Sequence, residues 1–334
     1  MTECVETAVT IEERLSIDAL RESWENLLNR TYDDTIFVSP VWLQVWCEHF
    51  SPKRPYLLTL EDDQGVSGLL PLQTIERDAE SVLTLLGDPE VMDYMDGLAE
   101  RDLAETILRA LWTRALDEIR WDRIELRHVP AESPLLPALS SLLESRGRSV
   151  RIEDEEVDPV VALPGTWDDY LQTLSKKQRH EIRRKLRRAE EGAEWEWRTA
   201  GSRADLERDL PVFFRLHEAS AHDKARFMTP AMRTFFSGLA STFLRRGELK
   251  LSIFRRDGVD IAATMSFLWR GRLLLYNSGY DPEYAAYSPG IAAVAKTIQG
   301  AIDDGARIFD FLSGDEPYKY QFGATNTFTK RLEA

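Results

Sequence analysis

The chain has 334 residues, of which 43% are hydrophobic and 30% are charged, and these values are ordinary for a soluble globular protein. Its formal net charge of −15 is unevenly distributed. The first 150 residues contain 14 Lys and Arg against 29 Asp and Glu, whereas the remaining residues contain 28 of each kind. An acidic first part repels nucleic acid and anionic membranes, so a polyanionic partner would have to bind the second part.

Several classes of protein are disfavoured by the sequence. Met1 to Glu13 is acidic and lacks the basic segment and apolar core of a secretory signal. No apolar run approaches the roughly 18 residues that a membrane-spanning helix needs. Cys4 and Cys47 form neither a disulfide framework nor a metal-binding pattern. We therefore expect a cytoplasmic protein with no metal and, from its length, two domains.

Two parts of the chain repeat one order of elements. Ile36–Trp42 recurs as Arg226–Met232, and in both a Ser or Thr that can cap a helix precedes a Pro suited to the first helical position. An amphipathic helix, a hairpin, a third strand, a second helix and a final strand are expected to follow in each copy. The expected strands are Tyr56–Leu60, Val66–Thr74, Val82–Leu86 and Arg123–His128, matched by Leu249–Phe254, Val259–Trp269, Leu273–Asn277 and Arg307–Leu312, and the expected second helices are Leu103–Ile119 and Ile291–Ile302.

Near-constant spacing indicates that the repeat is a duplication. The corresponding residues Phe37 and Phe227, Gly65 and Gly258, and Ile124 and Ile308 are 190, 193 and 184 positions apart. The repeated unit combines a mixed, mostly antiparallel sheet with flanking helices, which predicts an α/β or α+β fold. Between the copies, Val157–Leu163 and then a helix from about Trp167 to Glu191 are expected. Thr166 would cap this helix and Gly192 would end it.

Five segments together resemble the GNAT acyltransferase superfamily, in the double-domain form shared by FemAB peptidyltransferases and CelD-like proteins of polysaccharide operons. They are Ile36–Leu43, Asp93–Asp96, Leu174–Arg183, Tyr287–Gly290 and Asp310–Gly323. The resemblance implies two tandem GNAT-like domains. Residues 1–155 would shape the acceptor cleft without holding a donor. Residues 156–334, including the basic helix 167–191, would bind acyl-CoA or aminoacyl-tRNA, and an amine would be the acceptor.

The donor is expected at the helix start around Ser288, Gly290, Ile291 and Ala292. Free amides and the positive end of the helix dipole bind phosphate there; a plain N-cap followed by Pro is the alternative. The usual GNAT pyrophosphate loop is Arg/Gln-x-x-Gly-x-Gly/Ala, and Tyr287–Ala293 keeps only its small residues. The matching loop of the first copy is crowded with acids that would repel phosphate, namely Asp88, Glu90, Asp93, Asp96, Glu100 and Asp102.

The resemblance also implies that the backbone of the preceding strand, at Asn277, Ser278 and Gly279, pairs with the pantetheine arm of the donor. Gly279 would suit a β-bulge there, or would simply end the strand.

The last segment supplies groups that can move protons. Asp310 or Asp315 could be the base that deprotonates the amine, and Tyr318 and Tyr320 are placed for the acid role that tyrosines hold in GNAT enzymes. Tyr318-Lys319-x-x-Phe-Gly323 is similar to a FemX-type segment, which implies that Lys319 stabilises negative charge on the reacting oxygen. The alternatives are a buried acid capping a loop for Asp310 and a surface lysine for Lys319.

The remaining candidates are less specific. His217 is either an alternative base or a partly buried structural histidine. Tyr280 and Asp315 are expected to contact the substrate, and Asp93, Tyr94 and Asp96 are expected to line an acceptor pocket that suits a cation.

Lys176, Arg179 and Arg183 belong to a strongly basic run, which is either a solvated face or a clamp for the 3′-phosphate of CoA, a tRNA backbone, or an anionic lipid or glycan.

The sequence therefore predicts an acyl-CoA-dependent N-acyltransferase whose acceptor is the amine of an amino sugar, an amino acid or a polysaccharide or cell-envelope precursor. Attack would be direct, because no Cys or Ser with an attendant His forms a recognisable nucleophile set. A FemAB-type transferase that uses aminoacyl-tRNA and a catalytically inactive GNAT-like binding protein are the alternatives. The acyl chain, the acceptor and the oligomeric state are left open.

Overall fold

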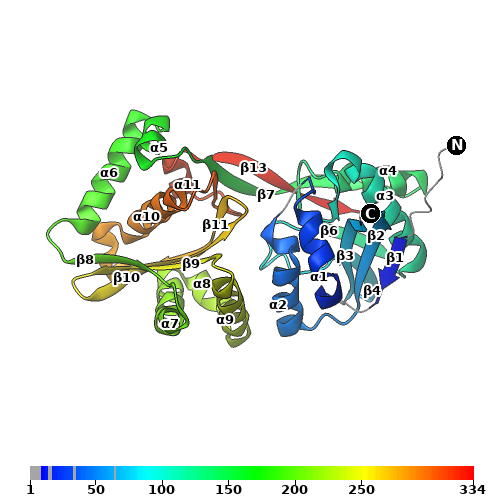
Figure 1. Cartoon of the computed structure of the whole chain (residues 1–334), viewed down its shortest axis with the longest axis horizontal. Helices are drawn as coiled ribbons and strands as arrows, with labels where there is room; N and C mark the ends of the chain where they lie inside the picture. Colours follow the sequence, from blue (N-terminus) through cyan, green and yellow to red (C-terminus); the bar gives the residue numbers. More distant parts are fainter. Residues whose placement is uncertain (1–8, 14–16, 33–34, 64) are drawn as a thin grey trace. The chain divides into compact units, whose positions relative to one another are not determined.

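The computed structural model in Figure 1 describes residues 9–13, 17–32, 35–63 and 65–334, so that Cys4 and most of Met1–Glu13 lie outside the described residues. The chain divides into two compact units, Met1–Glu156 with Phe328–Ala334, and Val157–Thr327. The sequence prediction had placed the last seven residues with the second domain, whereas they pack with the first. Strands β7 (Arg151–Ala162) and β13 (Thr325–Glu333) each run through both units.

In the first unit the strands follow the order β1-β2-β3-β4-β6-β13, and β5 pairs with β3. Helices α3 and α4 pack together, and α3 covers β2 and β3, while α1 packs on α2 and contacts β3. The strands are β1 (Val9–Glu12), β2 (Pro55–Asp62), β3 (Gly65–Arg77), β4 (Glu80–Leu85), β5 (Leu98–Ala99) and β6 (Arg123–Pro130). The helices are α1 (Ile17–Leu28), η1 (Ile36–Val38), α2 (Pro40–Phe50), η2 (Arg101–Leu103), α3 (Ala104–Glu118) and α4 (Leu135–Ser145).

In the second unit the order, read from the opposite edge, is β8-β9-β10-β11-β12-β7. It repeats the order of the first unit, with β7 in the place of β13. Helix α10 lies on one face of the sheet, and α7 and α9 lie on the other (Figure 1). The strands are β8 (Trp195–Thr199), β9 (Leu249–Arg256), β10 (Val259–Trp269), β11 (Arg272–Tyr280) and β12 (Ile308–Asp310). The helices are α5 (Trp167–Thr173), α6 (Lys176–Glu190), α7 (Arg203–Ser220), α8 (His222–Phe227), α9 (Pro230–Arg245), η3 (Pro282–Tyr287), α10 (Pro289–Asp303) and α11 (Pro317–Gln321).

The two copies begin in the same way. The Ser39 side chain accepts a hydrogen bond from Trp42 N at 3.2 Å, and that of Thr229 accepts one from Met232 N at 3.3 Å. In both cases a Pro occupies the first helical position, where no amide donor is needed. The predicted α/β architecture of mixed sheets flanked by helices is confirmed. The central strand β10 is almost continuously buried, because helices cover both of its faces.

The basic helix is two helices, not the single helix predicted over 167–191. Helix α5 ends at Thr173, and Ser175 starts α6 with a capping box in which its side chain and that of Gln178 each bond the other's backbone. This reciprocal cap satisfies two amides that a continuous helix would have bonded internally. Helix α6 ends at Glu190, and Gly192, with φ of +71°, follows as predicted.

Strand β11 contains a one-residue bulge. It pairs with β10 at Leu274–Phe267 and next at Asn277–Met265, so three steps on β11 face two on β10. An extra residue bends a strand and exchanges the faces to which later side chains point. Gly279 lies after this bulge, and its bare Cα lets α7 approach: an added Cβ would lie 2.4 Å from the backbone N and Cα of His217. The bulge predicted at Gly279 thus occurs earlier in the strand.

We predict that Gly279→Ala lowers the free energy of unfolding by about 1–3 kcal/mol, because the new methyl group meets backbone atoms that cannot rotate away. Gly300→Ala in α10 is the matched control, since nothing lies within 4 Å of the added Cβ. The control should be neutral or more stable by up to about 1 kcal/mol. Urea unfolding measures both variants, and equal stability of the two would contradict the close packing of α7 on β11.

Candidate functional site

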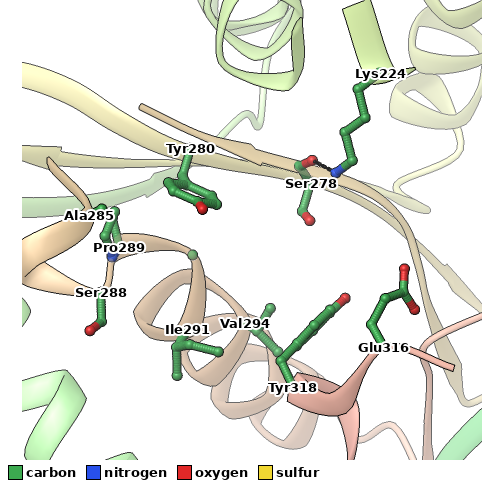
Figure 2. A pocket seen from close by; sticks show the side chains of 11 residues that line it. Lys224, Ser278, Tyr280, Ala285, Ser288, Pro289, Ile291, Val294, Glu316 and Tyr318 are labelled. Carbon is green, nitrogen blue, oxygen red and sulfur yellow. Dashed lines mark hydrogen bonds between the residues drawn. The ribbon is translucent and has the colours of Figure 1, made fainter. Parts of the chain in front are cut away.

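A cavity of about 350 Å³ lies at the N-terminal end of α10, inside the second unit (Figure 2). One wall is β11, a second is the start of α10, and a third is the segment around α11, while α8 contributes one lysine. The lining residues are Lys224, Ser278, Tyr280, Ala285, Ser288, Pro289, Gly290, Ile291, Val294, Glu316 and Tyr318.

The start of α10 presents amide donors to this cavity. Ser288 has a left-handed backbone with φ of +56°, and its hydroxyl makes no capping hydrogen bond to the helix. The first amides of a helix have no acceptor within the helix, and the positive end of the dipole lies beside them. The absence of a side chain at Gly290 leaves room for Tyr280, because a Cβ on residue 290 would lie 3.1 Å from Cδ1 of Tyr280. The glycine lets the Tyr280 ring close over the helix start.

Strand β11 has an open edge beside the same cavity. Its parallel pairing with β12 covers only Arg272–Leu274, and beyond Leu274 no strand of the described chain pairs with this edge. The Ser278 carbonyl instead accepts a hydrogen bond from Lys224 Nζ at 2.6 Å, drawn as a dashed line in Figure 2. The bulge turns Ser278 and Tyr280 toward the cavity, whereas Asn277 and Gly279 meet α7. A polar chain molecule could therefore pair with the exposed backbone of β11.

The loop after β12 is fixed by buried charges. Asp310 is fully buried and pairs with Arg272 at 2.8 Å, and its other oxygen accepts a hydrogen bond from Leu312 N at 2.8 Å. Leu312 has φ of +57°, a conformation that bulky side chains rarely adopt. Asp310 thus holds a strained turn at the end of the strand, and it does not line the cavity.

Lys319 is the centre of this loop, with only 2% of its surface exposed. Its ammonium donates to the carbonyls of Leu312, Ser313 and Gly314 at 3.0, 2.8 and 2.9 Å. It also pairs with Glu316 Oε2 at 2.9 Å. A Cβ on Gly314 would lie 2.6 Å from that same oxygen, so the glycine leaves room for the carboxylate. The loop is folded around the ammonium, which positions Glu316 at the cavity wall.

Two further groups on the cavity wall have shifted pKa values. Burial raises the pKa of the Tyr318 phenol above its ordinary value, and the Glu316 carboxylate adds to this effect. Burial lowers the pKa of Lys224; the Glu316 charge opposes this shift and the Lys319 charge adds to it. Tyr318 therefore stays protonated at neutral pH and can donate a proton, and Lys224 lies in a poorly solvated position.

His217 lies beneath the strand, outside the cavity lining. It is buried, its Nε2 bonds Asn277 Oδ1 at 2.9 Å, and its Nδ1 has no hydrogen-bond partner among the described residues. Burial, helped by the Lys224 charge and opposed by Asn277, lowers the pKa of His217 to about 4. The histidine is therefore neutral at physiological pH and fixes the side chain of Asn277 to α7.

The other predicted residues of the second unit lie outside the cavity lining. Tyr320 donates its hydroxyl proton to Asp315, which raises the pKa of the phenol, and its oxygen also lies 2.9 Å from Asn326 Oδ1. Arg179 donates to Leu171 O at 3.2 Å and so ties α6 to α5. Lys176 and Arg183 are exposed on α6, and Ala292 is buried in α10.

Asp93, Tyr94 and Asp96 belong to the first unit. Tyr94 is buried and packs its ring edge-on against Phe37, with the centroids 6.1 Å apart. Asp96 is buried as well, and its Oδ1 accepts hydrogen bonds from Gly97 N at 2.7 Å and from the Ser133 hydroxyl at 2.9 Å. Asp93 is partly buried. Tyr94 and Asp96 thus contribute to the interior of that unit.

Six of the predicted residues come together around the cavity, namely Ser278, Tyr280, Ser288, Gly290, Ile291 and Tyr318. The sequence reasoning missed Lys224, Ala285, Val294 and Glu316. Glu316 lies within the segment Asp310–Gly323, which the sequence prediction assigned to the site. Its position three residues before Lys319 was the feature of the sequence that could have identified it. Lys224 has no such signal, because a short helix far away in the sequence delivers it.

Within the described residues, no three His, Cys, Asp or Glu side chains are grouped so that they could hold a metal ion. The helices of the described chain also include none with the length and apolar character of a membrane span.

Comparison with known proteins identifies the fold. Residues 176–320 match the family described as acetyltransferase (GNAT) domain. The chain is similar to the crystal structure of FemX, with a TM-score of 0.70 and 10% identity over 94% of this chain and 95% of that one. It is also similar to a tandem GNAT protein from the clavulanic acid biosynthesis pathway, with a TM-score of 0.53 and 12% identity over 97% and 98%. The chain has a double-domain GNAT-type fold.

A third similar structure is that of a conserved protein of unknown function from Bacteroides thetaiotaomicron, with a TM-score of 0.63 and 12% identity over 98% of this chain and 99% of that one. No curated protein matches the sequence. The family match covers residues 176–320, and the structural neighbours share the fold of the chain.

We predict that His217 makes stability depend on pH in a defined window. Its pKa is about 4 in the folded protein and about 6.5 when unfolded, so between these values the unfolded state binds more protons. The contribution of the neutral histidine, about 3 kcal/mol, is therefore complete above pH 6.5 and is lost as pH falls toward 4.

Chemical unfolding at a series of pH values measures this effect by comparison with His217→Gln. The stability difference between the two proteins should change across the window and stay flat above it. Parallel pH profiles would contradict a buried, neutral histidine.

Proposed function

We propose that the cavity of the second unit binds an acyl-CoA and that the protein transfers its acyl group to an amine. The observation that carries this proposal is one continuous cavity that joins uncapped amides of α10, an open edge of β11, and the side chains of Tyr318 and Glu316. These features suit in turn a diphosphate, an amide-containing chain and a reacting thioester.

The residues present fit such a donor. The diphosphate would lie at the amides of Gly290 and Ile291, where the helix dipole favours negative charge. The pantetheine arm would pair with the free edge of β11 beyond Leu274, as an added strand does. Ile291 and Val294 supply an apolar wall beside it.

The proposed reaction is direct transfer. The amine nitrogen attacks the thioester carbonyl, a C–N bond forms, and the C–S bond breaks. Glu316 takes the proton that the nitrogen loses, because it is the carboxylate on the cavity wall. Tyr318 gives its proton to the departing thiolate, because it lines the same cavity. Lys319 is a positioning residue, which holds the loop and Glu316.

We predict that Ser288→Asp weakens binding of acetyl-CoA at least tenfold, because it adds a negative charge where the diphosphate would lie. The change should not harm the fold, since Asp tolerates a left-handed backbone and is a good N-cap. Isothermal titration calorimetry measures the affinity. Gln299→Glu in the same helix, away from the cavity lining, is the control with the same change of charge.

Unchanged affinity in Ser288→Asp would remove the donor from this site.

The exposed cations of α6, among them Lys176, Arg183 and Arg187, favour a second candidate, in which aminoacyl-tRNA is the donor. Binding of tRNA that weakens steeply with added salt, without any binding of acyl-CoA, would support this second candidate.

We predict that Tyr318→Phe lowers kcat for acyl transfer by about 10²-fold or more and leaves donor affinity unchanged, because the ring is kept and only the acidic proton is lost. Steady-state kinetics with release of the free thiol measures the effect. Tyr320→Phe is the control, because this tyrosine bonds Asp315 and Asn326 outside the cavity lining. Equal losses in both variants would exclude the acid role of Tyr318.

A further inference from the structure

Two opposite charges face the same cavity from different parts of the second unit. Lys224 reaches it from α8, and Glu316, which directly precedes α11, reaches it from a distant part of the unit's sequence (Figure 2). Glu316 belongs neither to the start of α10 nor to β11, and Lys224 reaches the β11 edge from α8, at the Ser278 carbonyl. The two side chains therefore mark a second recognition region within the cavity.

The ammonium of Lys224 has bonding capacity left over. It can donate three hydrogen bonds, and within the described residues it makes one, to the Ser278 carbonyl at 2.6 Å. The long side chain is half-buried, and its environment disfavours the charged form. A carboxylate bound at the remaining N–H groups would offset this cost through charge-assisted hydrogen bonds.

We propose, on the basis of the proposed function, that the acceptor is an α-amino acid whose carboxylate binds Lys224 while its amine faces Glu316. An α-amino acid carries both charges on one carbon, which matches a cation and an anion on neighbouring walls of a small cavity. Transfer forms the C–N bond of an N-acyl amino acid and breaks the C–S bond; Glu316 takes the amine proton, and the thiolate leaves as the free thiol.

The same pair of charges selects against other amines. A simple amine or an amino sugar has no anion for Lys224, so binding it would leave a poorly solvated ammonium without a carboxylate. A site that is built to bond a polar group rejects analogues lacking that group strongly. The proposal therefore predicts a preference for amino acids over the amines formed from them by loss of the carboxylate.

The test compares each of several amino acids with its decarboxylated amine in the full-length protein, with acetyl-CoA as donor. The wild type should use the amino acids at least tenfold better, measured as kcat/KM. Lys224→Met should raise KM for amino acids at least tenfold more than it raises KM for the amines, because only the amino acids carry the carboxylate that Lys224 would bind. Lys224→Arg should retain the preference. Lys177→Met, which removes an exposed cation of α6, is the control.

Calorimetric titration with N-acetyl amino acids and with N-acetyl amines gives a second readout that needs no turnover, and thermal unfolding verifies that each variant is folded. Binding of the N-acetyl amino acids that is lost in Lys224→Met supports the proposal, even if no donor is turned over. Equal use of amines and amino acids, or equal effects of Lys224→Met on both, overturns the proposal while the transferase function stands. If no acceptor receives an acyl group, the proposed transferase function is wrong. If no N-acetyl amino acid binds, the proposed carboxylate site at Lys224 is wrong.

Discussion

Strand β11 contains one residue more than β10 between the pairs Leu274–Phe267 and Asn277–Met265, and the arrangement of the cavity depends on this residue. Pairing with β12 stops at Leu274, directly before the bulge, so the strand continues with one edge unpaired. The bulge also exchanges the faces of β11, which turns Ser278 and Tyr280 toward α10 and leaves Asn277 and Gly279 against α7. Without the extra residue, the side chains on the cavity wall and those under α7 would trade places.

The duplicated units use the same order of strands differently. In the first unit β4 pairs with β3 in continuous register from Leu72–Leu85 to Arg77–Glu80, without the shift seen in β11. Most of the chain that follows it is buried, including Met92, Met95 and Leu98, and β5 returns to pair with β3. Where the second unit has a cavity lined by a helix start, the first unit has a packed segment. This difference is consistent with a donor site in the second copy.

Much of the architecture could be predicted because it rests on local signals. The caps at Ser39 and Thr229, the turns at Gly65 and Gly258, and the helix start at Ser288–Pro289 each depend on a few adjacent residues. The site was harder, because three of its features depend on distant packing. The bulge in β11 is set by its pairing with β10, Lys319 points into its own loop, and Lys224 comes from a short helix. A sequence shows which side chains can do chemistry, but the direction of each depends on contacts made after folding.

The central claim is that the unpaired edge of β11 and the start of α10 together hold the donor, and amide hydrogen exchange tests it most directly. Exchange followed by mass spectrometry, with and without saturating acetyl-CoA, reports protection along the whole chain. We predict that added protection is concentrated in peptides covering residues 275–280 and 288–292, because their backbone amides gain partners or lose access to water. Protection confined to other segments, such as the first unit, would contradict it.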